Sequence, residues 1–154
     1  MQTEPSGAIL PRLMSRLNSA DSERMPSRVG IDLIAVESVE ESIRAHDERY
    51  LNRVYTPREL ADCRTGGGVD AERLAARFAA KEATMKVLRP GAVAVPWNTI
   101  GVRREPGCAP EIELSGSAAT LARDVGIDDF LLSLTHDGGF AAAIVVAEVG
   151  DRRG

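Results

Sequence analysis

The chain has 154 residues, of which 44% are hydrophobic and 27% are charged. This length and composition fit one globular domain with its own hydrophobic core. The formal net charge of −4 lacks the basic balance of nonspecific nucleic-acid binders, so we expect no nucleic-acid partner. No signal-type segment or membrane-length apolar run occurs, so we expect a cytoplasmic protein without a membrane partner. The two cysteines, Cys63 and Cys108, have no CxxC spacing, which argues against a zinc site or a disulfide framework.

The first part of the chain differs in composition from the rest. Residues 1–27 are rich in proline and serine, and we interpret them as a flexible N-terminal extension. The domain is expected to span residues 28–150, and residues 151–154 form a short tail.

The first half of the domain is expected to be mainly helical. The run from Val29 to Val36 is rich in β-branched and aliphatic residues, which favours a buried strand. A helix is expected from about Val39 to Val54, and a capping box over 56–59 begins the next one. Residues 65–68 should be a loop. The segment from Ala71 to Leu88 is the strongest predicted helix, because it is rich in good helix formers and a Pro-Gly pair follows it.

The second half of the domain is expected to be mainly strands. The expected elements are strands over 93–102 and 111–114, a short helix that starts at 115–117 and ends at Gly126, and strands over 130–136 and 140–149. Asp137-Gly138-Gly139 joins the last two strands as a strong hairpin signal. The order of elements is not a strict βαβ alternation. It therefore predicts an α+β domain with a small antiparallel sheet packed on the long helix.

Two charged residues lie on apolar faces of the helix predicted over 71–88. Lys81 falls within an apolar stripe and Glu82 lies at its edge. An isolated buried charge is costly, so both residues need partners, a metal ion or a solvent-filled cleft. One interpretation is that Glu82 forms an ordinary surface pair with Lys86, one helical turn later. The other is that Glu82 is a ligand.

Asp32 is the one charged residue in its apolar strand. It is expected either to accept backbone hydrogen bonds near the strand end or to bind a hard cation. Mg²⁺ needs only one or two protein carboxylates when substrate phosphates and water complete its coordination. Asp32 and Glu82 would therefore suffice as the protein's contribution to a magnesium site.

Three further side chains are candidates for binding. His136 ends a predicted strand just before a hairpin turn, where its imidazole is either structural or available to a ligand. Arg49 and Arg53 share one face of a predicted helix, which is either a solvated face or a docking surface.

Taken together, the sequence resembles the holo-acyl carrier protein synthase family of phosphopantetheinyl transferases over about Val29 to Val149. The segments that carry the resemblance are Gly30-Ile31-Asp32, Arg53-Val54-Tyr55-Thr56 with Glu59, Arg77-Phe78-Ala79-Ala80-Lys81-Glu82-Ala83 with Lys86, and Ser133-Leu134-Thr135-His136. The order and spacing of these segments agree throughout with the family, and the RFAAKEA segment is the most specific.

The resemblance implies transfer of the 4′-phosphopantetheine arm of coenzyme A to a serine of an acyl or peptidyl carrier protein, with release of adenosine 3′,5′-bisphosphate. It implies that Asp32 and Glu82 hold Mg²⁺ against the pyrophosphate. Lys86 would offset phosphate charge, and His136 would fix a coenzyme phosphate or a metal-bound water. Lys81 would bind a phosphate or brace the carboxylate of Glu82. No side chain is an obvious sole general base.

The resemblance also implies partners. Pro110 resembles the proline of the family's Gly-x-Pro turn beside the adenine of the coenzyme. Arg49 and Arg53 would contact the acidic carrier protein. The family's assembly implies a homotrimer, in which each active site lies between two subunits.

Two departures from the family keep other functions open. The family usually has an arginine in its carrier-binding helix, six residues after the strand aspartate, where this chain has Ser38. Its Gly-Thr-Gly loop after the long helix is Arg89-Pro90-Gly91 here. A magnesium-dependent hydrolase of nucleotide pyrophosphates would use the same carboxylates without a carrier. A noncatalytic scaffold would bind coenzyme A as a trimer.

Overall fold

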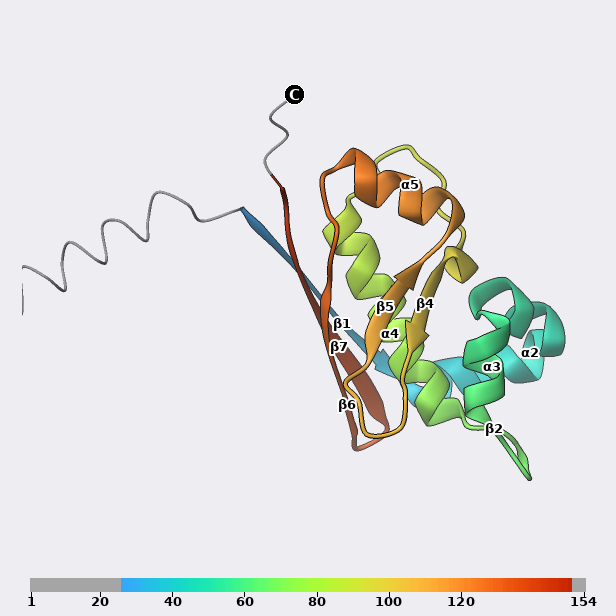
Figure 1. Ribbon diagram of the computed structural model, residues 1–154. Coiled ribbons are helices and arrows are strands. Elements are labelled where there is room, and N and C mark those ends of the chain that lie inside the picture. The colour runs from blue at the N-terminus through green and yellow to red at the C-terminus, as the bar shows by residue number, and fades with distance from the viewer. Residues whose placement is uncertain (1–25, 151–154) are drawn as a thin grey trace, which may run out of the picture.

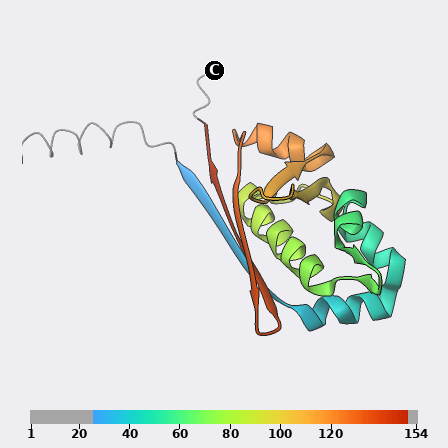
Figure 2. The ribbon, with the colours of Figure 1, turned by 60° about the horizontal axis from the view of Figure 1, so that its bottom comes forward.

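One long helix, α4 (Ala71–Leu88), lies across one face of a three-stranded antiparallel sheet (Figure 1). The structure is a computed structural model that describes residues 26–150. Figure 2 shows the sheet on one side of α4 and the remaining helices on the other side. This arrangement confirms the predicted α+β fold with a small antiparallel sheet packed on a long helix.

The strands of the sheet pair in the order β1-β7-β6. Strand β1 (Ser27–Ala35) pairs along its whole length with β7 (Phe140–Glu148). On its other edge, β7 pairs with β6 (Leu131–Asp137). The β6–β7 hairpin turns at Gly138 and Gly139, whose φ angles are 57° and 81°. Glycine is the residue best suited to such left-handed backbone, so the predicted hairpin is confirmed at its predicted turn.

Helix α4 (Ala71–Leu88) has the predicted bounds. The carboxylate of Asp70 caps it by accepting a hydrogen bond from the backbone N–H of the third helical residue, at 3.1 Å. The helix lies so close to β1 that a Cβ atom on Gly30 would be only 2.0 Å from the carbonyl oxygen of Ala83. The glycine therefore sets how closely the strand and the helix approach each other.

Helix α2 (Val36–Val54) follows β1 directly, three residues earlier than the predicted start at Val39. The backbone N–H of Val36 donates to the carbonyl of Gly139 at 2.9 Å, so the helix begins from the end of the sheet itself. Asp47, with φ 44° and ψ −132°, interrupts α2 and divides it into two parts. The two parts therefore need not present one continuous face.

Helix α3 (Pro57–Cys63) begins with the predicted capping box of Thr56 and Glu59. The residues after it were predicted to be a loop, but they form a minimal hairpin of β2 (Arg64–Thr65) and β3 (Gly68–Val69). Gly68, the first residue of β3, has a φ angle of 120°, a backbone conformation that favours glycine.

The strand predicted over 93–102 is shorter than expected. Residues 93–96 have no regular structure, and a 3-10 helix, η1 (Trp97–Thr99), precedes the actual strand β4 (Ile100–Arg103). Pro96 has no backbone N–H to donate to a neighbouring strand, which explains the late start. Strand β4 pairs with β5 (Glu111–Leu114) as predicted.

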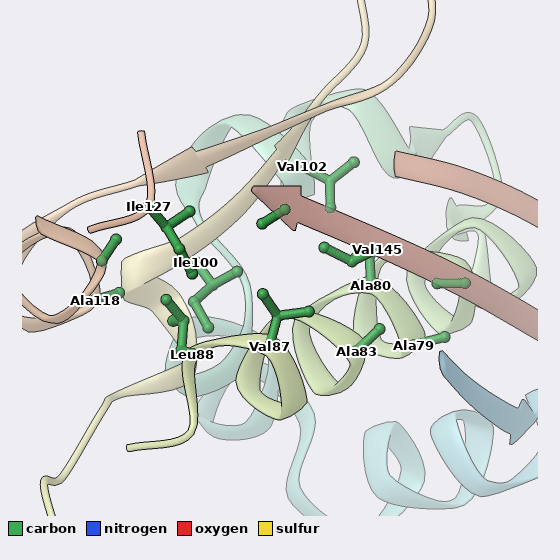
Figure 3. Close-up of a cluster of buried hydrophobic side chains, with 13 residues drawn as sticks. Ala79, Ala80, Ala83, Val87, Leu88, Ile100, Val102, Ala118, Ile127 and Val145 are labelled. Atoms are coloured by element: carbon green, nitrogen blue, oxygen red, sulfur yellow. The ribbon is translucent and has the colours of Figure 1, made fainter. Parts of the chain in front are cut away.

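Helix α5 (Gly116–Asp124) follows β5 and completes the side of the domain that faces away from the sheet. The largest buried cluster joins α4, β4, β7 and α5 (Figure 3). Its helical contribution consists mainly of alanines, including Ala79, Ala80 and Ala83. Because these side chains are small, strands on both sides of α4 pack close to its backbone.

The face of the sheet turned away from α4 is apolar and exposed. We call it the outer sheet face; its large side chains are Val29, Ile31, Leu33, Leu131 and Ile144, which are 59%, 63%, 66%, 70% and 41% exposed. The prediction that β1 is buried on both sides is therefore wrong for a single chain. In the part of the chain that the structure describes, successive side chains of β1 point alternately toward α4 and toward solvent.

The N-terminal extension predicted over 1–27 lies outside the described residues except for its last two residues. Ser27 already belongs to β1, and the carbonyl of Pro26 accepts a hydrogen bond from Val149 at 2.8 Å. The predicted tail over 151–154 also lies outside the described residues. From residue 26 to residue 150, no helix is long and apolar enough to cross a membrane.

Candidate active site

Asp32, Glu82 and Lys86 come together between β1 and the second half of α4. Asp32 is on the face of β1 that packs toward α4, because it alternates with the exposed residues of the outer sheet face. The ammonium of Lys86 donates to Oδ1 of Asp32 at 3.0 Å and to the backbone carbonyl of Ile31 at 2.5 Å. Lys86 thus has Asp32 as its ion-pair partner, which differs from the surface pair with Glu82 that its spacing suggested.

The carboxylate of Glu82 lies in the field of Asp32. Partial burial raises the pKa of Glu82, the negative charge of Asp32 raises it further, and Lys86 opposes both effects. Two neighbouring carboxylates with one ammonium leave an excess of negative charge that a divalent cation would neutralise. No group of three or more metal-ligating side chains occurs in residues 26–150. Asp32 and Glu82 therefore suit an Mg²⁺ ion whose other ligands are phosphate and water.

The resemblance implied that Lys81 could bind a phosphate, but the structure buries this side chain inside the protein. Its side chain is completely buried, and its ammonium donates to Oε2 of Glu59 at 2.7 Å and to the backbone carbonyls of Trp97 and Ile100. Burial lowers the pKa of Lys81, while the Glu59 carboxylate opposes that shift. Because the ammonium points into the protein with its donors in use, the predicted contact between Lys81 and a phosphate is corrected to a structural ion pair.

His136 lies at the exposed end of β6, as predicted, but its partner comes from α4. Its Nδ1 is 2.8 Å from Oε1 of Glu72, and both side chains are about half exposed. His136 also lines a cavity of about 370 Å³ together with Arg73, Arg77 and Arg104. This cavity is therefore strongly basic, which suits a phosphate group.

Arg77 lines this basic cavity with a hydrogen-bond donor that has no partner among the described residues. It is 8% exposed, and its Nε atom is buried without a hydrogen-bond partner in the described structure. Its Nη1 donates to the carbonyl of Arg73 at 3.3 Å, and its Nη2 is 3.7 Å from the carboxylate of Asp62. Sequence reasoning did not single out Arg73 and Arg77 as ligands, although their i, i+4 spacing in a confident helix was a usable signal.

His136, which lines the basic cavity, lies apart from Asp32, Glu82 and Lys86, which we call the carboxylate site. Glu72, the partner of His136, is in the first turn of α4, whereas Glu82 is in its second half. A helix rises 1.5 Å per residue, so roughly 15 Å along the helix axis separates these positions. Asp32, Glu82 and Lys86 are therefore brought together, and His136 is not among them.

The remaining candidates occupy other places. Pro110 lines a cavity of about 420 Å³ between β5 and the start of β6. Arg49 and Arg53 are exposed in the part of α2 that follows the interruption at Asp47, and their spacing places them on one face. Ser38 is exposed in the first part of α2, where the neighbouring exposed side chains are acidic.

Comparison with known proteins agrees with this geometry. A family model described as the 4′-phosphopantetheinyl transferase superfamily matches residues 28–145. The chain is 43% identical over 119 residues to the holo-[acyl-carrier-protein] synthase of Moorella thermoacetica, which covers 77% of this chain and 91% of that protein. It is 40% identical over 120 residues to the holo-[acyl-carrier-protein] synthase of Koribacter versatilis, with coverages of 77% and 95%.

Two solved structures share the fold. The ACPS–CoA complex of Chronobacterium ammoniagenes has a TM-score of 0.70 and 27% sequence identity, covering 82% of this chain and 99% of that one. The Helicobacter pylori holo-[acyl-carrier-protein] synthase in complex with coenzyme A has a TM-score of 0.67 and 28% identity, with coverages of 79% and 100%. The chain therefore belongs to the 4′-phosphopantetheinyl transferase superfamily, and within it to the holo-acyl carrier protein synthase family that its motifs indicated.

Proposed function

We propose that this protein transfers the 4′-phosphopantetheine arm of coenzyme A to a serine of an acyl or peptidyl carrier protein. The observation that carries the proposal is the convergence of Asp32, Glu82 and Lys86 between β1 and α4, in a chain of this family. The serine oxygen forms a bond to the β-phosphorus of coenzyme A. The bond from that phosphorus to the bridging oxygen breaks, and adenosine 3′,5′-bisphosphate leaves.

Each residue of the carboxylate site then has a task. Asp32 and Glu82 are the residues that hold Mg²⁺, which supplies charge neutralisation at the pyrophosphate when it is bound. Lys86 is half exposed, so its flexible ammonium is free to exchange Asp32 for a phosphate oxygen of the substrate. Because both carboxylates are assigned to the metal, the serine proton passes to a water molecule in the site.

We assign the basic cavity to a phosphate of the same coenzyme. The buried, unpartnered Nε of Arg77 supports this role, because an anion would satisfy it. His136 lines the cavity, and its bond to Glu72 at Nδ1 leaves Nε2 for a ligand. Pro110 remains a proposed contact for the adenine.

We further propose that the protein is a homotrimer with active sites between subunits. Two observations support this assembly: the outer sheet face is apolar and exposed on one chain, and His136 lies apart from the carboxylate site. A neighbouring copy that packs on the outer sheet face and reaches past the edge strand β1 would supply the second half of each site. Arg49 and Arg53 are proposed to contact the carrier protein.

The experiment that tests the function is the intact mass of several carrier proteins after incubation with this protein, coenzyme A and Mg²⁺. The proposal requires one carrier to gain the mass of phosphopantetheine, and metal-free and Glu82→Gln reactions to leave it unmodified. Coenzyme A consumed without a modified carrier would favour the pyrophosphate hydrolase. Coenzyme A bound but unchanged, with no carrier modified, would favour the scaffold.

A further inference from the structure

The most completely buried ion pair in the described chain contributes no group to the proposed reaction. Glu59 and Lys81 are both 0% exposed. Oε2 of Glu59 accepts from Nζ of Lys81 at 2.7 Å and from the backbone N–H of Thr56 at 2.8 Å, and Oε1 accepts from the N–H of Val102 at 2.9 Å. The pair therefore ties the start of α3 to the middle of α4 and to β4.

Stability alone does not account for this pair. Apolar residues of similar volume usually stabilise a buried position at least as well as an ion pair, because they avoid the desolvation of two charges. An ion pair with further hydrogen bonds differs from apolar packing in one respect. It is satisfied in only one arrangement of the elements that carry it, whereas apolar side chains tolerate small rotations and shifts.

The position of Lys81 on α4 indicates which neighbouring residue the ion pair holds in place. Lys81, Glu82 and Ala83 are consecutive. Lys81 is held on the side of α3 and β4, and Ala83 is held against β1 by the close approach of Gly30. Glu82 lies between these two fixed residues, so α4 cannot rotate about its axis without breaking one of the contacts.

We propose that Glu59 and Lys81 are a positioning pair that fixes the rotation of α4 and thereby aims the Glu82 carboxylate at Asp32. This inference rests on the proposed function, because it assigns Glu82 to the metal. Neither residue of the pair touches the substrate.

The test compares the double variant Glu59→Gln/Lys81→Met with the wild-type protein. The two substitutions remove both charges together, so neither charge is left buried without a partner. Binding of Mn²⁺ in the presence of coenzyme A, measured by the electron paramagnetic resonance of free Mn²⁺, reports on the carboxylates without any carrier protein. We expect the Mn²⁺ dissociation constant to rise about 10-fold or more, as for other residues that orient metal ligands.

Thr84→Val is the matched control. Thr84 is also a fully buried polar residue of α4, but its hydroxyl donates to the carbonyl of Ala80 within the same helix. This variant should fold and should bind Mn²⁺ like the wild type. Glu59→Asp is a second test, because it keeps both charges and shortens the carboxylate arm by one methylene.

The outcomes separate the two proposals. Wild-type Mn²⁺ affinity in either folded variant, the double variant or Glu59→Asp, overturns the positioning role. Failure of both variants to fold overturns it as well, since the pair would then be needed for the fold itself. Weakened Mn²⁺ binding in the variants supports the positioning role even if the wild type modifies no carrier, a result that would overturn only the proposed function.

Discussion

Glu82 shows how a single residue can serve the site at the expense of the fold. Burial and the charge of Asp32 raise its pKa, so the native chain binds the Glu82 proton more tightly than the unfolded chain does. Stability from such a group is present at low pH and is lost as pH rises through the native-state pKa. At neutral pH, the ionised Glu82 therefore destabilises the metal-free protein.

Glu82→Gln should make the protein more stable and less active. In buffer without divalent cations at pH 7, we expect a gain in the free energy of unfolding on the order of 0.5 kcal/mol, as for partly exposed charges. The gain should disappear below pH 4.5, the ordinary pKa of this carboxyl. Transfer to the carrier should fall about 100-fold or more. Urea unfolding and the transfer assay measure the two effects, and a loss of stability at pH 7 would contradict the assignment.

At the scale of elements, the contact between β1 and α4 holds the carboxylate site together. Asp32 lies on the strand, Glu82 and Lys86 lie on the helix, and the distance between the two elements depends on Gly30. Any side chain at this glycine would meet backbone atoms of α4, which cannot rotate away as a flexible side chain can.

Gly30→Ala is expected to force the two elements apart. The new Cβ would lie 2.0 Å from the carbonyl oxygen of Ala83, so we expect a loss of about 1–3 kcal/mol or more in the free energy of unfolding. Transfer activity should fall even at temperatures where the variant stays folded, because Asp32 moves away from Glu82. Gly66→Ala is the control, since a Cβ there meets no atom within 4 Å. Equal stability of the two variants would refute the close-approach argument.

The second part of α2 should govern the encounter with the carrier protein. Arg49 and Arg53 are exposed on one face after the interruption at Asp47. Reversing both charges in Arg49→Glu/Arg53→Glu should raise the KM for the carrier about 10-fold with little change in kcat, and the difference should shrink in high salt. Arg49→Lys/Arg53→Lys keeps the charge and should resemble the wild type. A KM unaffected by charge reversal would place the docking surface elsewhere.

The sequence predicts α4 to its ends, because the segment has strong helix propensity and a clear stop signal. It singles out Asp32 and Glu82 because a charge in an apolar run needs a partner, and the structure places the two carboxylates near each other. Their role as metal ligands stays a prediction. The partner of Lys81 was not foreseen, because Glu59 is distant in sequence and only the packing of α3 on α4 brings it near. The sequence pattern alone does not distinguish a charged side chain that binds a ligand from one that pairs with a buried opposite charge.

At the scale of the whole molecule, the outer sheet face explains the one strand whose burial was predicted wrongly. The outer side of β1 carries Val29, Ile31 and Leu33, large apolar side chains of the kind that are normally covered by another part of the protein or by a partner. One chain covers only the face that packs on α4. The pattern in the sequence is thus the pattern expected for an assembly of several copies.

Ile31→Arg should prevent assembly. This side chain is 63% exposed in the middle of the outer sheet face, so a charge there costs the single chain little but would be buried in the proposed trimer. We expect a trimer for the wild type and a monomer for the variant in sedimentation velocity, with transfer activity lost. Val93→Arg is the control, because Val93 is similarly exposed at 53% but lies outside the sheet. A monomeric wild type with full activity would contradict the proposed assembly.

The exposed outer sheet face, through the proposed division of each active site between two copies, has a genetic consequence. A copy with Glu82→Gln still carries an intact basic cavity, and a copy with Arg77→Met still carries intact carboxylates. In the proposed trimer, assembled from both kinds of copy, some sites take each half from the copy in which it is undamaged, about a quarter of them after random mixing. Two inactive alleles present in the same cell should therefore complement each other, whereas either allele alone should not support carrier modification.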